Sequence, residues 1–269
     1  MWKMSVAALL CALALLTACG GEEPLNWTPS PAVPAPTASL PAAEDAPWAA
    51  LTVADLPTAL AKPEDMAAGA ADQILLLGCK LEKEIFLYGL GQEYGGGILL
   101  RRGEVLTHFD QEFVSPSAPA LPELYLTDSD GEESLAVRYL MSADGDRISY
   151  DLHLYTWDGA AWSDCAATHD ACARKALAEV TTDRDGDRFT LSYGATSAVY
   201  QLPDACRSAS GQLVLDSCFF REEEGVFTVV LGARLDVTGV RFANILAAID
   251  WEGTDFSLRD IRIEPTTVV

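Results

Sequence analysis

The chain has 269 residues, of which 18 are Lys or Arg and 40 are Asp or Glu, so its formal net charge at pH 7 is −22. This negative field repels phosphate groups, which excludes a nucleic-acid-binding function and favours cationic partners or divalent ions. The same charge is also typical of a solvated acidic surface that keeps an exported protein in solution.

Residues 1–19 predict a secretory signal. One lysine precedes the apolar run SVAALLCALALL, which is too short to span a bilayer. The run ends in LTACG, which resembles a bacterial lipobox, where a cysteine after small residues becomes the lipidated first residue of the mature chain. The resemblance implies that Cys19 carries the acyl chains and that they anchor the protein in the membrane, outside the cytoplasm.

A tether and one folded domain are predicted after the signal. Residues 20–48 contain 7 of the 14 prolines and few β-branched residues, which is typical of a semi-extended spacer. Removing residues 1–19 takes away one lysine and no acidic residue, so 17 basic residues face 40 acidic ones and the charge becomes −23. The remaining residues, 49–269, predict a single β-rich domain, within which 203–269 could form a subdomain.

The first predicted elements of this domain are a short helix and a series of strands. Residues 63–78 begin with proline and acids and continue with helix formers, so we expect a short N-terminal helix there. Short segments rich in β-branched and aromatic residues then predict about ten strands. These segments cover residues 84–90, 97–109, 135–141, 148–157, 188–194, 197–202, 211–220, 225–237, 245–251 and 256–264.

The loop TDSDGEES, at residues 127–134, has two interpretations. Asp128, Asp130 and Glu132 offer oxygen ligands at alternating positions around a glycine, as a calcium loop requires. The alternative is an acidic turn between two strands. The passage from here to LHLYTWDGAAW resembles FG-GAP or VCBS-type repeats, which implies a propeller-like module with bound calcium, although Leu126 and Ser134 stand where that pattern has acidic residues.

A small turn motif recurs four times in the strand-rich part. An acidic residue and a glycine are followed two positions later by a large apolar residue and then by Ser or Thr. The acid-glycine pair supplies the positive φ of tight hairpins, so the apolar residue should face the core and the hydroxyl residue the solvent. Trp157 and Trp251 precede two of these turns and should pair across them with Trp162 and Phe256. The turns begin at Asp144, Asp158, Asp185 and Glu252.

Two further local features are predicted. Thr168 should cap a helix formed by HDACARKALAEV, whose acid lies early and whose basic residues lie later. In a regular last strand, Phe256 and Leu258 would point to one face of the sheet, and Ile261 and Ile263 would point to the opposite face. One extra residue would bring both pairs to the buried face, so we expect a β-bulge near Arg259 or Asp260.

Five cysteines remain after Cys11 is removed and Cys19 is lipidated. In an oxidising compartment the neighbours in sequence are the natural disulfide candidates, Cys165 with Cys172 and Cys206 with Cys218, which leaves Cys79 free. The segment Cys165-x-x-x-His169-x-x-Cys172 also offers three zinc ligands, but it lacks a paired C-x-x-C and a fourth ligand, so a disulfide or separate thiols is the simpler interpretation.

No nucleophile, zinc-protease or P-loop motif occurs in the sequence. His153 shares a strand face with Ser149, but four residues of strand separate them by about 13 Å, too far for proton transfer. We therefore expect His153 and His108 at the solvent or at a rim. With so many acidic residues, two carboxylates at the separation that a glycosidase needs would arise by chance. The tryptophans of the hairpins have two interpretations, a platform for a ligand or cross-strand packing.

The sequence thus predicts a mainly β fold, an antiparallel meander forming a partial propeller-like or two-sheet sandwich domain with one or two short helices; α+β is the alternative. The wider chain is also similar to uncharacterised lipoproteins and extracytoplasmic modules of Firmicutes, which implies a location and no activity. We expect a non-catalytic binding or sensing module with no cofactor other than a structural calcium ion, and an envelope protein or cell-wall ligand as partner. The alternatives are a carboxylate-dependent hydrolase and a calcium-stabilised adhesion module.

Overall fold

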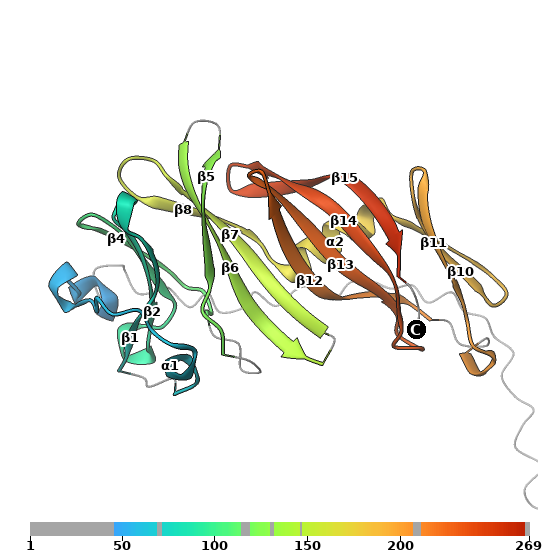
Figure 1. The fold of residues 1–269 in the computed structure, drawn as a ribbon, viewed down its shortest axis with the longest axis horizontal. Helices are drawn as coiled ribbons and strands as arrows, with labels where there is room; N and C mark the ends of the chain where they lie inside the picture. Colours follow the sequence, from blue (N-terminus) through green and yellow to red (C-terminus); the bar gives the residue numbers. More distant parts are fainter. Residues whose placement is uncertain are drawn as a thin grey trace, which may run out of the picture. The chain divides into compact units, whose positions relative to one another are not determined.

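A computed structural model describes residues 46–68, 72–113, 119–129, 132–145, 147–206 and 211–266. These residues belong to one unit that runs from Pro41 to Val269. They form a mainly β structure built almost entirely from antiparallel pairs, which confirms the predicted fold class (Figure 1). Cys19 and most of the predicted tether lie outside the described residues.

The helices are short, and strands contain most of the described residues. The helical elements are η2 (Pro47–Ala50), η3 (Val53–Asp55), α1 (Pro63–Ala68), η4 (Leu81–Lys83), η5 (Gln92–Tyr94), α2 (His169–Glu179) and η6 (Asp204–Cys206). The strands are β1 (Ile74–Lys80), β2 (Ile85–Leu90), β3 (Ile98–Arg102), β4 (Val105–Phe109), β5 (Glu123–Ser129), β6 (Glu132–Asp144), β7 (Arg147–Trp157), β8 (Trp162–Ala167), β9 (Thr181–Asp185), β10 (Arg188–Tyr193), β11 (Thr196–Gln201), β12 (Leu213–Glu223), β13 (Val226–Leu235), β14 (Arg241–Glu252) and β15 (Asp255–Pro265).

The described strands form three sheets. The N-terminal sheet has the order β1-β2-β3-β4, and a small sheet has the order β11-β10-β9. The central sheet has the order β15-β14-β13-β12-β7-β6-β5, with β8 also paired to β7. Both β8 and β12 therefore adjoin β7, and β12 does so through one parallel contact, Cys218 with Ser149. Helix α2 connects β8 to the small sheet and packs beside this branch point, against β7 and β12.

The helix predicted over residues 63–78 is only partly correct. Helix α1 ends at Ala68, and Ile74–Lys80 forms strand β1. Strand β1 pairs with β2, with a register shift at Leu77, and the side chains of residues 74–77 alternate between the two faces of the N-terminal sheet. Pairing with a neighbouring strand outweighs the helical preference of these leucines, because the strand buries both of its faces.

The four predicted acid-glycine turns are confirmed. Each one joins two antiparallel strands, and its glycine has a positive φ, between 61° and 98°. Both aromatic pairs form across their hairpins, with ring centroids 5.3 Å apart for Trp157 and Trp162 and 6.1 Å apart for Trp251 and Phe256. One expectation was wrong: Ser149 is buried, because a register shift in β6 places it against Ser142 and β12 lies on its other side.

The cap and the bulge are also confirmed. The Thr168 hydroxyl accepts a hydrogen bond from the backbone N–H of Ala171 and so begins α2. In the β14–β15 pair, Ala248 lies opposite Arg259 but Leu246 lies opposite Arg262, so β15 has one extra residue between these two pairs. Asp260, within this bulge, has a φ of 54°. The extra residue moves Ile261 and Ile263 onto the buried face.

The central sheet is covered on both faces. Leu152 and Leu154 of β7 join the largest core, which also contains apolar residues of α2, the small sheet and β12–β15. Tyr155 lies on the opposite face of β7 and joins a second core, formed with Leu87 and Leu100 of the N-terminal sheet. A third core lies on the outer face of the N-terminal sheet, beneath η2 and η3. Strand β7 is therefore buried between two layers.

Candidate binding site

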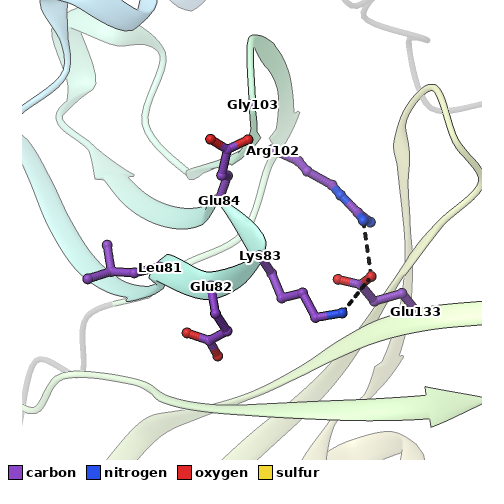
Figure 2. Close-up of a pocket in the computed structure, with 7 residues that line it drawn as sticks. All are labelled: Leu81, Glu82, Lys83, Glu84, Arg102, Gly103 and Glu133. Atoms are coloured by element: carbon purple, nitrogen blue, oxygen red, sulfur yellow. Dashed lines mark hydrogen bonds and ion pairs between the residues drawn. The ribbon is translucent and has the colours of Figure 1, made fainter.

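A pocket of about 620 Å³ lies where the N-terminal sheet meets the β5–β6 hairpin (Figure 2). Its lining includes three carboxylates and two cations. Leu81, Glu82, Lys83 and Glu84 come from η4 and the residue after it, Arg102 and Gly103 come from the end of β3 and its turn, and Glu133 comes from β6. Backbone torsion positions the first group, because Glu84 adopts a left-handed conformation that ends η4.

Glu133 pairs with both cations of the pocket. Its Oε2 atom accepts hydrogen bonds from Lys83 Nζ at 3.3 Å and from Arg102 Nη2 at 3.0 Å. Lys83 and Arg102 both point toward it, whereas Glu82 and Glu84 extend away (Figure 2). The two cations are therefore engaged by one carboxylate, and the exposed carboxylates of Glu82 and Glu84 leave the rim negative.

Two buried polar atoms in this cluster lack a partner. Arg102 Nη1 and Glu133 Oε1 are both inaccessible, and the described part of the chain offers neither of them a hydrogen bond. One is a donor and the other is an acceptor. Leaving a polar group unsatisfied when it is buried costs free energy, so these two atoms offset part of the stability that the ion pairs contribute.

The predicted tryptophan pair lies behind Arg102. Its guanidinium carbon is 5.0 Å from the ring centroid of Trp157 and 5.8 Å from that of Trp162. Trp162 is buried and Trp157 is half-buried. The stacking fixes the long arginine side chain, because cation–π contacts with partly desolvated rings are attractive. Cross-strand packing therefore explains the two tryptophans, and their role at the site is to hold Arg102.

The acidic loop proposed for calcium is next to this pocket in sequence. Strands β5 and β6 pair up to Ser129 with Glu132, as a hairpin turn requires. Asp130 and the side chains of Asp128 and Glu132 lie outside the described residues. Within the described ranges no group of three His, Cys, Asp or Glu side chains is arranged to hold a metal ion. The calcium site stays a prediction.

The histidines have partners that the sequence did not indicate. His153 was expected at a rim but is only 5% exposed, because β7 is covered on both faces. Its Nδ1–H donates to Asp164, whose two carboxylate oxygens lie at 2.9 and 3.0 Å. His108 is half-buried, stacks on Trp48 with centroids 5.0 Å apart, and lies 2.8 Å from the carbonyl oxygen of Gly96 through Nε2.

A tyrosine pair extends the His153 cluster. Tyr155 donates to Gln111 Oε1 at 2.8 Å and accepts from the Tyr139 hydroxyl at 3.1 Å. Burial raises the pKa of both tyrosine hydroxyls well above the ordinary value, so both remain protonated. His153 contacts both rings, edge-on to Tyr139 and stacked on Tyr155. The network satisfies polar groups inside a core and thereby fixes how the two sheets pack.

His169 does not serve a zinc site. Its Nε2–H donates to the Leu215 carbonyl at 2.8 Å, and its backbone N–H donates to Asp151 Oδ1 at 2.7 Å. Burial raises the pKa of Asp151, and this hydrogen bond partly offsets that effect. Both contacts fix the first turn of α2 to the central sheet, so the imidazole is used in packing the helix.

Each described cysteine is present as a free thiol. The Cys206 thiol lies 3.6 Å from the carbonyl oxygen of Val237. The disulfide pairs Cys165–Cys172 and Cys206–Cys218 stay predictions. Cys165 lies in the largest core, and Cys79 is half-buried on β1.

No protein-family model matches the chain, and no curated protein is similar to it at a significant level. Among the described helices, none combines the length and the apolar character needed to cross a membrane.

Proposed function

We propose that the protein is a non-catalytic binding module, anchored outside the cytoplasmic membrane by lipid on Cys19, and that it binds a basic segment of an envelope protein in the pocket around Glu133. The observation that carries this proposal is the charge arrangement of the pocket. Glu133 engages both cations, so the exposed carboxylates of Glu82 and Glu84 are free to pair with cationic groups of a partner.

The excess of 40 acidic over 18 basic residues would in addition attract a basic partner from a distance.

Calorimetric titration of the full chain with a lysine-rich peptide and with an acidic peptide of equal length tests the binding. We expect only the basic peptide to bind. The Glu82→Gln, Glu84→Gln double variant should lose about tenfold in affinity, since two rim ion pairs contribute about 1 kcal/mol or somewhat more in total.

The double variant Glu179→Gln, Glu223→Gln is the matched control. It removes two exposed carboxylates from α2 and β12, outside the pocket, and should keep nearly the full affinity. The proposal fails if both double variants lose affinity equally, which would indicate attraction by net charge alone, or if the acidic peptide binds as well as the basic one.

Metabolic labelling with a fatty acid tests the anchor. When the full chain is expressed in a bacterium that lipidates its exported proteins, we expect label on the wild type and none on Cys19→Ser. The Cys79→Ser variant is the control and should remain labelled. Equal label on the wild type and Cys19→Ser would contradict the proposed anchor.

A further inference from the structure

Strand β5 leaves one edge of the central sheet open. It pairs with β6 from Glu123 with Arg138 to Ser129 with Glu132, and this register contains no shift. The sheet ends at β5. In an antiparallel pair the N–H and C=O groups of alternate residues point away from the partner strand. Within the described ranges, no further backbone hydrogen bond engages these groups of β5.

The other edges of the described sheets are short, bulged or engaged. Strand β9 has five residues, three of them charged. Strand β1 has a register shift and accepts a hydrogen bond from the Ala61 N–H at Leu76 O. Strands β4 and β8 meet where the Trp162 N–H donates to Thr107 Oγ1, and β15 has the bulge at Asp260 and packs along β11. Features of this kind hinder the addition of a further strand, whereas β5 is seven residues long, regular and free of proline.

The open edge lies beside the pocket around Glu133. In the register of the hairpin, Glu133 is opposite Asp128 of β5, and Leu135 is opposite Leu126. Residues two apart on a strand share a face, so Leu126 and Glu133 lie on the same face of the hairpin. Leu126 is 37% exposed, although Leu135 opposite it is fully buried. The edge therefore presents an apolar side chain to solvent on the face that holds the pocket.

Strand β1 and η4 lie over this hairpin. Gly78 of β1 packs directly on Leu124 of β5, since a Cβ atom at this glycine would be only 2.7 Å from Leu124 Cδ1. Five residues later, Lys83 of η4 reaches Glu133 of β6 at 3.3 Å. The acidic rim of the pocket flanks Lys83 in sequence and is thus placed beside the β5–β6 hairpin.

We propose that the basic segment binds as an added strand along the open edge of β5, with backbone hydrogen bonds to the outward-facing groups of this strand. The inference rests on the proposed function and specifies the conformation and the sequence pattern of the partner. Every second side chain of an added strand points to the face that holds the pocket, at intervals of about 7 Å. An apolar side chain there contacts Leu126, and a basic side chain two positions along the segment faces the acidic rim.

Charge selects the kind of strand that fits this edge. Residues Glu123–Ser129 have the sequence ELYLTDS, with two acids and no base. A second copy of β5 would add two more acids beside them, whereas a basic strand places opposite charges across the pair, which is favourable. The acidic excess of the whole chain opposes self-association in the same way. The occupant is therefore a basic segment of another protein.

Two peptides with backbone N-methyl groups test the proposal. Both have one lysine-rich sequence with a leucine at every second position, and the N-methyl groups are on the odd residues of one peptide and on the even residues of the other. An added strand donates from alternate residues only. By calorimetry with the full chain, we expect one peptide to bind within about threefold of the unmethylated parent and the other to lose about tenfold or more.

The outcomes separate this inference from the proposed function. Equal losses for the two peptides, or no loss for either, while the parent still binds would overturn strand addition and leave the binding of a basic segment intact. If the parent peptide does not bind at all, the proposed function fails and strand addition fails with it.

A variant pair and hydrogen exchange locate the added strand on the protein. Leu126→Lys places a positive charge on the open edge and should lower the affinity by about tenfold. Val199→Lys is the matched control, because Val199 is an exposed apolar residue of β11, and it should keep most of the affinity. In the wild-type full chain, saturating peptide should slow amide exchange in β5 and leave that of the edge strand β9 unchanged. Unchanged exchange in β5 would overturn the proposal.

Discussion

The β7–β8 and β14–β15 hairpins start from the same local motif and end in different surroundings. Each has a tryptophan before an acid-glycine turn and an aromatic partner across the strands. Each also has a cation over a ring: Arg102 lies 5.0 Å from the centroid of Trp157, and Lys175 Nζ lies 4.7 Å from that of Phe256. The sequence motif thus produces the same cross-strand aromatic pair twice, and the cation beside each pair comes from another element of the fold.

The difference lies in the partners of the two cations. Arg102 is paired with Glu133, whose side chain is 25% exposed, whereas Lys175 is paired with Asp255, whose side chain is 72% exposed. The first cation connects the N-terminal sheet to the central sheet beside a pocket. The second contacts a carboxylate in water. A hairpin motif sets local geometry, and contacts from distant strands decide whether a site is formed beside it.

The largest effect is expected from the buried ring of each hairpin. Trp162 is 4% exposed and Phe256 is 2% exposed. Replacement of either by alanine should lower the free energy of unfolding by about 3 to 5 kcal/mol, because it leaves a large cavity. Denaturant unfolding measures this loss. Trp157→Ala and Trp251→Ala are the controls and should lose less, since both rings are half-buried. A loss below about 1 kcal/mol for Trp162→Ala would show that this ring is not packed as described.

Replacing the cation of either hairpin should lower the free energy of unfolding by a smaller amount, and the two losses should differ. Arg102→Gln removes the contacts with two rings and leaves Glu133 with Lys83 alone, so we expect a loss of about 1 to 2 kcal/mol. Lys175→Gln should lose less than about 1 kcal/mol, because its ion pair is exposed to solvent. Denaturant unfolding at low and high salt measures both. Equal losses would remove the distinction between the two hairpins.

The smallest expected effect on stability comes from the ionisation of one exposed acid in each hairpin, Asp158 and Asp255. Hydrogen bonds from the backbone N–H groups of Ala161 and Ala160 lower the pKa of Asp158. The backbone N–H of Phe256 and, after it, Lys175 lower the pKa of Asp255. Both carboxylates therefore stabilise the fold above their ordinary pKa of 3.8, and this contribution is lost as the pH falls through the lowered values.

Titration of the carboxyl carbon signals by NMR separates these two causes. Lys175→Ala should raise the pKa of Asp255 toward its ordinary value and leave that of Asp158 unchanged. High salt should act in the same direction on Asp255, because it screens the ion pair but not the backbone hydrogen bonds. A parallel rise for both residues would contradict the assignment of Lys175 to one hairpin only.

The predictions from sequence succeeded where the signal is local. Acid-glycine turns, the Thr168 cap and the bulge at Asp260 each depend on a few consecutive residues. Strands without a clear pattern were missed, such as the polar edge strand β9 and the strand β8, whose sequence is WSDCAA. Their pairing is determined by the strands beside them, which the local sequence does not specify.

The candidate site could be predicted only in part, for the same reason. The tryptophan pair and the acidic character of the β5–β6 turn follow from adjacent residues. Glu133 meets Arg102 and Lys83 only because two sheets pack together. The burial of His153 likewise requires both faces of β7 to be covered.

Tryptophan fluorescence during titration with a lysine-rich peptide tests the central claim most directly, because Arg102 joins the proposed binding pocket to Trp157. We predict a saturable change in emission that persists in Trp251→Phe and is largely lost in Trp157→Phe, while calorimetry shows that both variants still bind the peptide. If the change is lost in Trp251→Phe and retained in Trp157→Phe, the peptide binds elsewhere, and the pocket around Glu133 is not the binding site.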